Sequence, residues 1–301
     1  MPAARMASYA DEPALLDRVR ELLERVFPGL PAQMDLAAPL GLRWDRCSTP
    51  FVAESVGRLI AHVGVMEMRL VLAGEEHRVG VLHAVATDPA ERRRGHYRAV
   101  MAEVLPWCER RWATLVLNTG QPELYEPFGF RTIPEHRFVS TDCAHGGRAA
   151  AKGIGAAAPP AFRALDYGLA GDRDRLRALL AERVPVSRRL GVVGEAQAFA
   201  FNEAARPPAW GPDLDVVLCS EHEGTTLRIH DVIARRMPTL DVILARIDAP
   251  VDRVECYFAP DLLDPGLAAE PHVLHGEEHL MVRGPFPPEG EPLMLPRPAR
   301  C

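Results

Sequence analysis

The sequence predicts an α/β (α+β) fold in which helices cover a mixed sheet, followed by a second α/β unit. Three observations predict it. The N-terminal half alternates helix-like and strand-like patterns, one strand leads through an arginine-rich turn into a helix, and a segment rich in Ala, Gly and Pro divides the 301 residues. We therefore expect domains over residues 1–143 and 162–301, with a linker over residues 144–161.

The first expected element is an amphipathic helix over residues 11–27. Asp11 is a plausible N-cap, and Pro28 with Gly29 ends the helix. A loop or short helix follows over residues 29–50. Apolar residues recur at helical spacing along residues 11–27, namely Leu15, Val19, Leu22 and Val26.

Strands are expected next, over residues 51–55, 57–74 and 78–87, with a turn at residues 75–77. A helix follows over residues 96–112. Pro106 removes one helical hydrogen bond, so we expect a kink or an early end there. A strand over 113–118, a helical turn over 120–128 and one or two strands over 129–139 complete the domain. Strand, turn, helix and strand together predict a parallel crossover unit.

The second half repeats part of this order. A helix is expected over residues 172–184, and a hairpin turns at residues 221–225. A helix over 238–247 then lies between two strands, and a last strand covers residues 279–286. This half has no glycine-containing arginine turn.

Composition excludes several classes of protein. The formal net charge of -6 argues against a general nucleic-acid binder. No stretch is apolar enough to span a membrane, and the N-terminus lacks a signal-peptide core. The cysteines are scattered without metal-ligand spacing, so we expect reduced thiols and no metal. We therefore expect a cytoplasmic protein with no membrane partner; a homo-oligomer stays open.

The stretch "ATDPAERRRGHYRAV", residues 86–100, predicts a phosphate site. A strand enters a turn that opens a helix, so the first helical amides lack partners and favour an anion. Gly95 lets the backbone approach a ligand closely. The amides are those of Gly95, His96 and Tyr97, and the surrounding cations are Arg92, Arg93, Arg94 and Arg98.

This stretch resembles motif A of the GNAT superfamily of N-acetyltransferases, [Q/R]-x-x-G-x-[G/A]. Arg92, Gly95 and Tyr97 occupy its defined positions, although Tyr97 replaces a small residue. "RRRGHYRAVM" is closer to the Eis-type branch. "NTGQPELYEPFGF" resembles a second GNAT motif, N-x-x-A-x-x-x-Y-x-x-x-G-F, through Asn118, Tyr125 and the Gly-Phe pair at 129–130; Gln121 replaces the alanine.

The resemblance implies a GNAT fold, with a mixed sheet splayed at the acetyl-CoA site and a second, degenerate GNAT-like domain. The backbone of Val85, Ala86 and Thr87 would bind the pantetheine arm, and the arginine turn would hold the diphosphate. Asn118 would order the site or contact the pantetheine. The implied activity is acetyl transfer from acetyl-CoA to an amine, directly in a ternary complex.

A small-molecule amine is the favoured acceptor, and the acidic balance is compatible with an aminoglycoside-like or polyamine acceptor. A protein amine and a non-catalytic acyl-CoA-binding protein are the alternatives. The second domain is expected to bind no CoA and to shape the acceptor site or an oligomer interface.

The resemblance also implies catalytic roles. Tyr125 occupies the position of the general acid that protonates the departing thiolate. Two candidates for the base stay open: His83, whose ordinary pKa suits proton removal near neutral pH, and Glu54 acting through water. Whether Cys301 brings a carboxylate to the site is also open.

Overall fold

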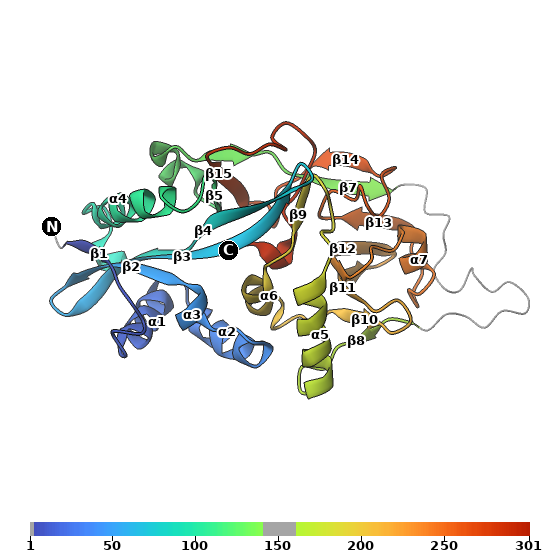
Figure 1. Ribbon diagram of the computed structural model, residues 1–301, viewed down its shortest axis with the longest axis horizontal. Helices are drawn as coiled ribbons and strands as arrows, with labels where there is room; N and C mark the ends of the chain where they lie inside the picture. Colours follow the sequence, from blue (N-terminus) through green and yellow to red (C-terminus); the bar gives the residue numbers. More distant parts are fainter. Residues whose placement is uncertain (1–2, 141–160) are drawn as a thin grey trace, which may run out of the picture.

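Two mixed β-sheets lie side by side along the long axis of the molecule (Figure 1). The structure is a computed structural model, and it describes residues 3–140 and 161–301. The chain runs through the first sheet, enters the second, and returns to the first near its end.

The first sheet has the strand order β1-β2-β3-β4-β5-β15-β6, and β9 pairs with β3. The long strands β3 and β4 are antiparallel, and β4 runs parallel to β5. Its strands are β1 (Ala4–Met6), β2 (Thr49–Ser55), β3 (Arg58–Leu72), β4 (Glu75–Thr87), β5 (Leu115–Thr119), β6 (Arg131–Ile133), β9 (Leu190–Val192) and β15 (His279–Arg283).

Helices cover both faces of this sheet (Figure 1). On one face lie α1 (Leu15–Val26), α2 (Leu30–Ala37) and α3 (Trp44–Cys47), while α4 (His96–Glu109) lies on the other. The alternation of β2 explains this: Val52 packs with the helix α1 core, whereas Phe51 and Ala53 pack with the helix α4 core. Short 3-10 turns are η1 (Ala38–Leu40), η2 (Pro89–Glu91), η3 (Pro122–Leu124), η4 (Glu126–Phe128) and η5 (Arg297–Ala299).

The second sheet has the order β14-β7-β13-β12-β11-β10-β8. The expected hairpin is present as β11 and β12, and β12 runs parallel to β13 with α7 between them. Its elements are β7 (His136–Ser140), β8 (Arg163–Ala164), β10 (Ala209–Gly211), β11 (Val216–Glu223), β12 (Thr226–Ala234), β13 (Arg253–Cys256), β14 (Ala268–Pro271), α5 (Ala170–Glu182), α6 (Ala196–Glu203) and α7 (Leu240–Leu244).

The two sheets exchange strands across the predicted domain limits. β7 comes from the range 1–143 but lies in the second sheet, between β13 and β14. β9 and β15 come from the range 162–301 but lie in the first sheet. The linker expected over residues 144–161 lies outside the described residues, except for residue 161.

Several local expectations were wrong for identifiable reasons. Helix α4 does not end at Pro106 but continues to Glu109, because its buried apolar face offsets the lost hydrogen bond. The β3–β4 turn lies at Ala73 and Gly74, both with positive φ, and residues 75–77 belong to β4. Helix α1 begins at Leu15, so its N-cap is Ala14 and not Asp11. The helix expected over 238–247 is reduced to α7.

No helix in the two described ranges is both long and apolar enough to cross a bilayer.

A buried ion cluster joins the elements of the second half. Arg183 follows α5 and is fully buried, and its two Nη atoms bind the carboxylate of Asp231 on β12 at 2.7 and 2.8 Å. It also pairs with Glu195, the N-cap of α6. The cluster therefore fixes α6 relative to β12.

We predict that Arg183→Met destabilises the protein by about 3–5 kcal/mol, because it leaves two buried carboxylates without a cation. Arg235→Met is the matched control. Arg235 pairs with exposed Glu182 and Asp215, and its loss should cost at most about 1 kcal/mol. Urea unfolding measures both; equal losses would contradict the role of the cluster.

Candidate functional site

Strands β4 and β5 diverge after a short contact. They share only two residue pairs, Gly80 with Leu115 and Val81 with Val116. Beyond these pairs the strands separate, so the sheet is splayed as expected. Such an opening exposes backbone groups that a ligand can bind as an added strand.

A β-bulge shapes the β4 side of the splay. The pairing shifts between His62 and Gly64, which leaves an extra residue on β4, where Ala84 has a φ of 49°. The carbonyl of Ala84 accepts a hydrogen bond of 2.8 Å from His62 Nδ1. Burial lowers the pKa of His62 to about 4, so this ring is neutral at physiological pH and holds the bulge.

A cavity of about 1150 Å³ occupies the splay, and we call it the splay cavity. Most of the predicted site residues line it. They are His83, Val85, Thr87, Arg92, Arg93, Gly95, His96, Tyr97, Arg98, Asn118 and Tyr125.

Three predicted residues do not line the splay cavity. Ala86 points to the opposite face of β4 and packs in the α1 core, as alternation requires. Arg94 is exposed and donates to Glu91 at 2.8 Å. Glu54 binds Arg5 and Arg18 at the surface, and these hydrogen bonds, Arg18 first, lower its pKa. Glu54 is therefore badly placed to act as a base, even through water.

The arginine turn, which we call the cradle, has the features of an anion site. Gly95 caps α4 with a φ of 83°, and the first α4 bond runs from Ala99 N to Gly95 O. The preceding amides therefore have no partner within the helix. Arg93 also adopts a left-handed φ of 63° and lines the cavity. Cations and free amides thus face the same space.

Tyr97 fills space that a small residue would leave open. Its ring packs edge-on against Tyr125 and Phe128, with centroids 5.9 and 5.4 Å apart. Its hydroxyl donates to the carbonyl of Leu124 at 3.2 Å. Tyr97 thereby fixes the turn that carries Tyr125.

Tyr125 lines the splay cavity although its side chain is largely buried. Burial raises its pKa to about 12. The phenol therefore keeps its proton at physiological pH, as a general acid must.

His83 is buried between the splay cavity and α3. Its Nε2 lies 2.9 Å from Ser48 Oγ, and its ring meets Trp44 edge-on at 4.9 Å. Burial and the nearby His62 lower its pKa to about 3. The ring is thus neutral but only weakly basic, which favours a positioning role over that of a base.

His96 starts α4 and is buried. Its Nε2 lies 3.6 Å from Glu91, while its Nδ1 has no hydrogen-bond partner within the described residues. It lines the cavity beside the cradle.

The end of the chain also lines the splay cavity, through Cys301. Its N donates to Asn118 Oδ1 and its O accepts from Asn118 N, each at 3.3 Å. Asn118 Nδ2 is buried and has no partner within the described part of the chain. Asn118 therefore ties this segment to β5 and keeps one donor free for a ligand.

Buried ion pairs hold residues 297–301, which we call the C-terminal segment. Arg300 donates to Glu135 at 2.5 Å, and Arg297 pairs with Glu203 at 2.9 Å. The amide of Asn202 on α6 donates to the carbonyls of residues 297, 298 and 300. Sequence reasoning missed these contacts because no local pattern indicates which carboxylate meets which arginine.

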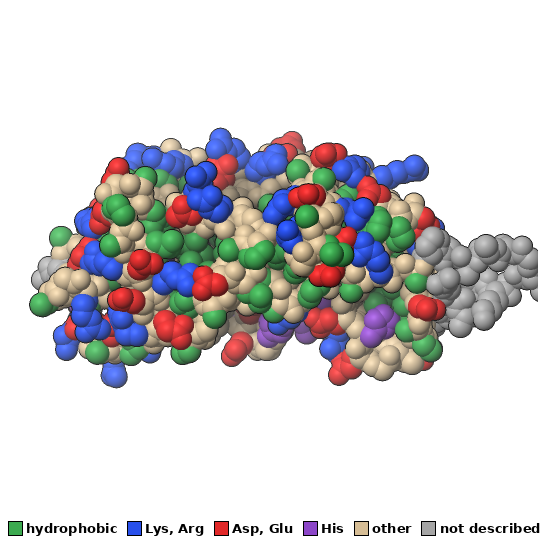
Figure 2. All heavy atoms as spheres, turned by 90° about the horizontal axis from the view of Figure 1, so that it is seen from below, with side chains coloured by type: hydrophobic (Ala, Val, Ile, Leu, Met, Phe, Trp, Pro, Cys, Tyr) green, Lys and Arg blue, Asp and Glu red, His purple; other side chains and the backbone are tan. Residues whose placement is uncertain are grey.

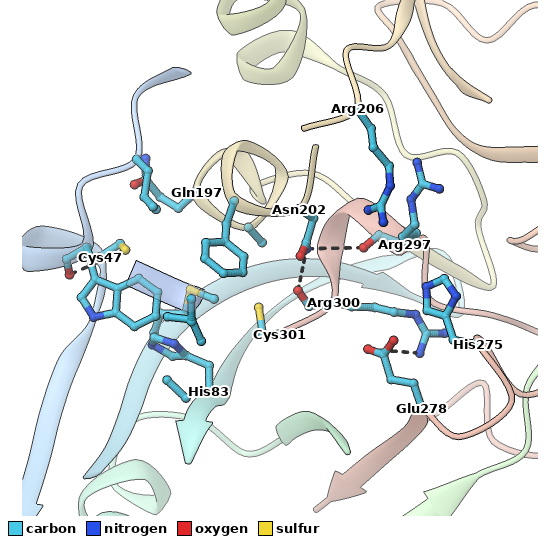
Figure 3. A pocket seen from close by; sticks show the side chains of 17 residues that line it. Cys47, His83, Gln197, Asn202, Arg206, His275, Glu278, Arg297, Arg300 and Cys301 are labelled. Atoms are coloured by element: carbon cyan, nitrogen blue, oxygen red, sulfur yellow. Dashed lines mark hydrogen bonds and ion pairs between the residues drawn. The ribbon is translucent and has the colours of Figure 1, made fainter. Parts of the chain in front are cut away.

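A second cavity of about 220 Å³ lies beside the first, between α3, α6 and the C-terminal segment (Figure 3). Leu30, His83, Ala84 and Cys301 line both cavities. The two spaces therefore meet at His83.

The face seen in Figure 2 mixes acidic and basic side chains and carries no continuous basic surface. In the described ranges, no group of three or more His, Cys, Asp or Glu side chains could hold a metal ion.

The fold and the cradle can be compared with known proteins. Residues 12–133 match the family model described as an acetyltransferase (GNAT) domain. No curated protein matches the chain by sequence.

Solved structures are similar over nearly the whole chain. A probable N-acyltransferase from Enterococcus faecalis has a TM-score of 0.59 at 13% identity, with 94% of this chain and 72% of that chain covered. Eis1 from Mycobacterium abscessus has a TM-score of 0.58 at 16% identity, with 94% and 73% covered. A GCN5-related N-acetyltransferase from Kribbella flavida has a TM-score of 0.51 at 13% identity, with 94% and 71% covered. At these identities the likeness establishes the fold.

The match over residues 12–133 is to a GNAT acetyltransferase domain, and it supports an acyltransferase. The two-sheet fold of the described residues is that of the Eis-like structures. The predicted fold class is thus confirmed.

We predict that Gly64→Ala displaces His83. A Cβ at this position would lie 2.6 Å from His83 Nε2 and 2.9 Å from Ser48 Oγ, so the ring must move and its hydrogen bond must break. Urea unfolding should show a loss of about 1–3 kcal/mol. Gly171→Ala is the control, since a Cβ there meets nothing within 4 Å in helix α5. A Gly64→Ala protein as stable as the control would contradict this packing.

Proposed function

We propose that the protein transfers an acetyl group from acetyl-CoA to an amine in a ternary complex. The observation that carries the proposal is the joint position of the arginine cradle and Tyr125 on one cavity at the splay. The cradle suits a diphosphate, the splayed strands suit an extended pantetheine arm, and Tyr125 suits the thioester end.

The chemistry requires three events. The amine nitrogen forms a bond to the acetyl carbon, the carbon–sulfur bond breaks, and the thiolate takes a proton. Tyr125 is the proposed donor of that proton, because burial keeps its hydroxyl protonated. Backbone amides near Val85 are proposed to stabilise the negative charge on the carbonyl oxygen.

The attacking amine must also lose a proton. His83 is a weak acceptor, and Glu54 lies elsewhere. The carboxylate side chains that line the splay cavity in the described residues are those of Glu91 and Glu277, and Glu91 is engaged by Arg94. We propose that Glu277 receives this proton, directly or through water.

The cradle is tested by Arg93→Ala. This change removes one cation from the cavity and should weaken CoA binding about tenfold, the usual size of a lost charge-assisted hydrogen bond. Isothermal calorimetry measures the Kd.

Arg94→Ala is the matched control for that experiment. Arg94 is the adjacent arginine, but it pairs with Glu91 and does not line the cavity, so CoA affinity should change less than about twofold. Equal effects of the two variants would argue against a built cradle.

The acid role is tested by Tyr125→Phe, which should lower kcat by about 10² or more while the Kd for CoA stays unchanged. Tyr167→Phe is the control, since this buried hydroxyl donates to Glu203 O at 3.3 Å outside the splay cavity. Thiol release with a reactive amine measures both.

The pH dependence follows from the same residue. Because burial raises the pKa of Tyr125 to about 12, wild-type turnover should not fall near pH 10, where an ordinary tyrosine ionises. A Tyr125→Phe enzyme within twofold of wild type would exclude Tyr125 as the acid.

A further inference from the structure

The second cavity can deliver an acceptor to the splay cavity. The two spaces share His83, Ala84 and Cys301 in their walls. A molecule in the second cavity can therefore place one atom at the junction while the rest lies between α3, α6 and the C-terminal segment.

One end of the second cavity is apolar and aromatic. The rings of Trp44 and Phe201 lie 6.1 Å apart, and Trp44 also meets His83. Leu42, Met66 and Ala198 extend this wall. Aromatic and aliphatic walls of this kind favour an apolar body.

The other end is polar. Figure 3 shows His83 and Cys47 at one end, Arg297, Arg300 and Glu278 at the other, and Cys301 between them. Arg300 is 4% exposed, and its Nη1 is buried without a hydrogen-bond partner in the described residues. Its ion pair with Glu278 is 4.0 Å long, which is beyond hydrogen-bond distance. A buried guanidinium nitrogen without a hydrogen bond, on a residue that lines a cavity, favours an oxygen acceptor in the ligand.

The charges at the polar end are largely paired. Arg206, Arg297 and Arg300 line this end, against one carboxylate, Glu278. Glu203, Glu221 and Glu135 are already occupied as partners of Arg297 and Arg300. The three guanidinium groups therefore face four carboxylates, and it is the apolar wall of the cavity that disfavours a polyamine.

The size of the cavity sets a further limit. An apolar cavity of about 150 Å³ holds one benzene molecule. The volume of about 220 Å³ therefore fits one ring with a short substituted chain.

We propose that the second cavity binds the acceptor, and that this acceptor is a compact amine with a ring-sized apolar body and an oxygen that accepts a hydrogen bond from Arg300 Nη1. The proposal rests on the acetyl transfer proposed above. This class differs from the aminoglycoside-like or polyamine acceptor with which the acidic balance is compatible. The oxygen can belong to a carboxylate or to a neutral carbonyl.

The test is calorimetric binding of four probes to the CoA-saturated protein. The probes are phenylalanine, phenylalaninamide, 2-phenylethylamine and spermidine. Phenylalanine carries a carboxylate, and phenylalaninamide carries a neutral carbonyl. The compound 2-phenylethylamine has the ring but neither oxygen, and spermidine has no apolar ring. We expect phenylalanine or phenylalaninamide to bind at least about tenfold more tightly than spermidine. The same probe should bind at least about fivefold more tightly than 2-phenylethylamine. Which of the first two binds better identifies the source of the oxygen.

Two variants locate the binding. Phe201→Ala should weaken every ring-bearing probe about tenfold, with Leu169→Ala as an exposed control outside both cavities. Arg300→Lys keeps a cation opposite Glu135 but should remove the advantage of the oxygen-bearing probes over 2-phenylethylamine. Arg235→Lys is its control, and the retained CoA affinity of each variant shows that it is folded.

The outcomes separate the two proposals. Tighter binding of spermidine, absence of binding by all ring-bearing probes, or binding indifferent to Phe201→Ala and Arg300→Lys would overturn the acceptor proposal. Thiol release is then measured with the same probes. Acetylation of spermidine alone would support acetyl transfer but contradict the proposed class of acceptor. Phe201-dependent and Arg300-dependent binding with no thiol release from any amine would support the ligand class and contradict acetyl transfer.

Discussion

The insertion of β15 between β5 and β6 is the constraint on which the site depends. β5 shares five residue pairs with β15 but only two with β4. β5 is therefore held mainly from the side away from the splay, and it can leave β4 without becoming an open edge. In this register Leu280 lies opposite Asn118, at the point where the end of the chain meets β5.

Carboxylates from three different elements then hold the wall of the second cavity. Glu135 follows β6, Glu203 ends α6 and Glu221 lies on β11, and together they pair with Arg297 and Arg300. A buried ion pair adds little net stability, but it fixes geometry, because each unpaired charge would be costly. This wall of the second cavity is thus set by charge pairing rather than by regular secondary structure.

Much of the first domain could be predicted from the sequence, because its signals are local. The two motifs, from Arg92 to Tyr97 and from Asn118 to Tyr125, each span one short stretch of sequence. Alternation on β4 places Val85 and Thr87 on one face and Ala86 on the other. The strand exchange could not be predicted, since the sequence patterns of β15 and β7 do not indicate which strands they pair with. The ion pairs that hold Glu54 outside the splay cavity could not be predicted for the same reason, because Arg5 and Arg18 come from other elements.

The strand exchange also sets an order of assembly. Thr119 finds its partner, His279, only after about half of the chain has followed it. During synthesis, one edge of β5 therefore stays unpaired until the strands of the second sheet have been made. β7 likewise stays unpaired until β13 and β14 have been made. Pairings so distant in sequence slow folding and leave apolar edges exposed to other chains. The two halves of this molecule are consequently a single folding unit, although most strands of each sheet come from one half.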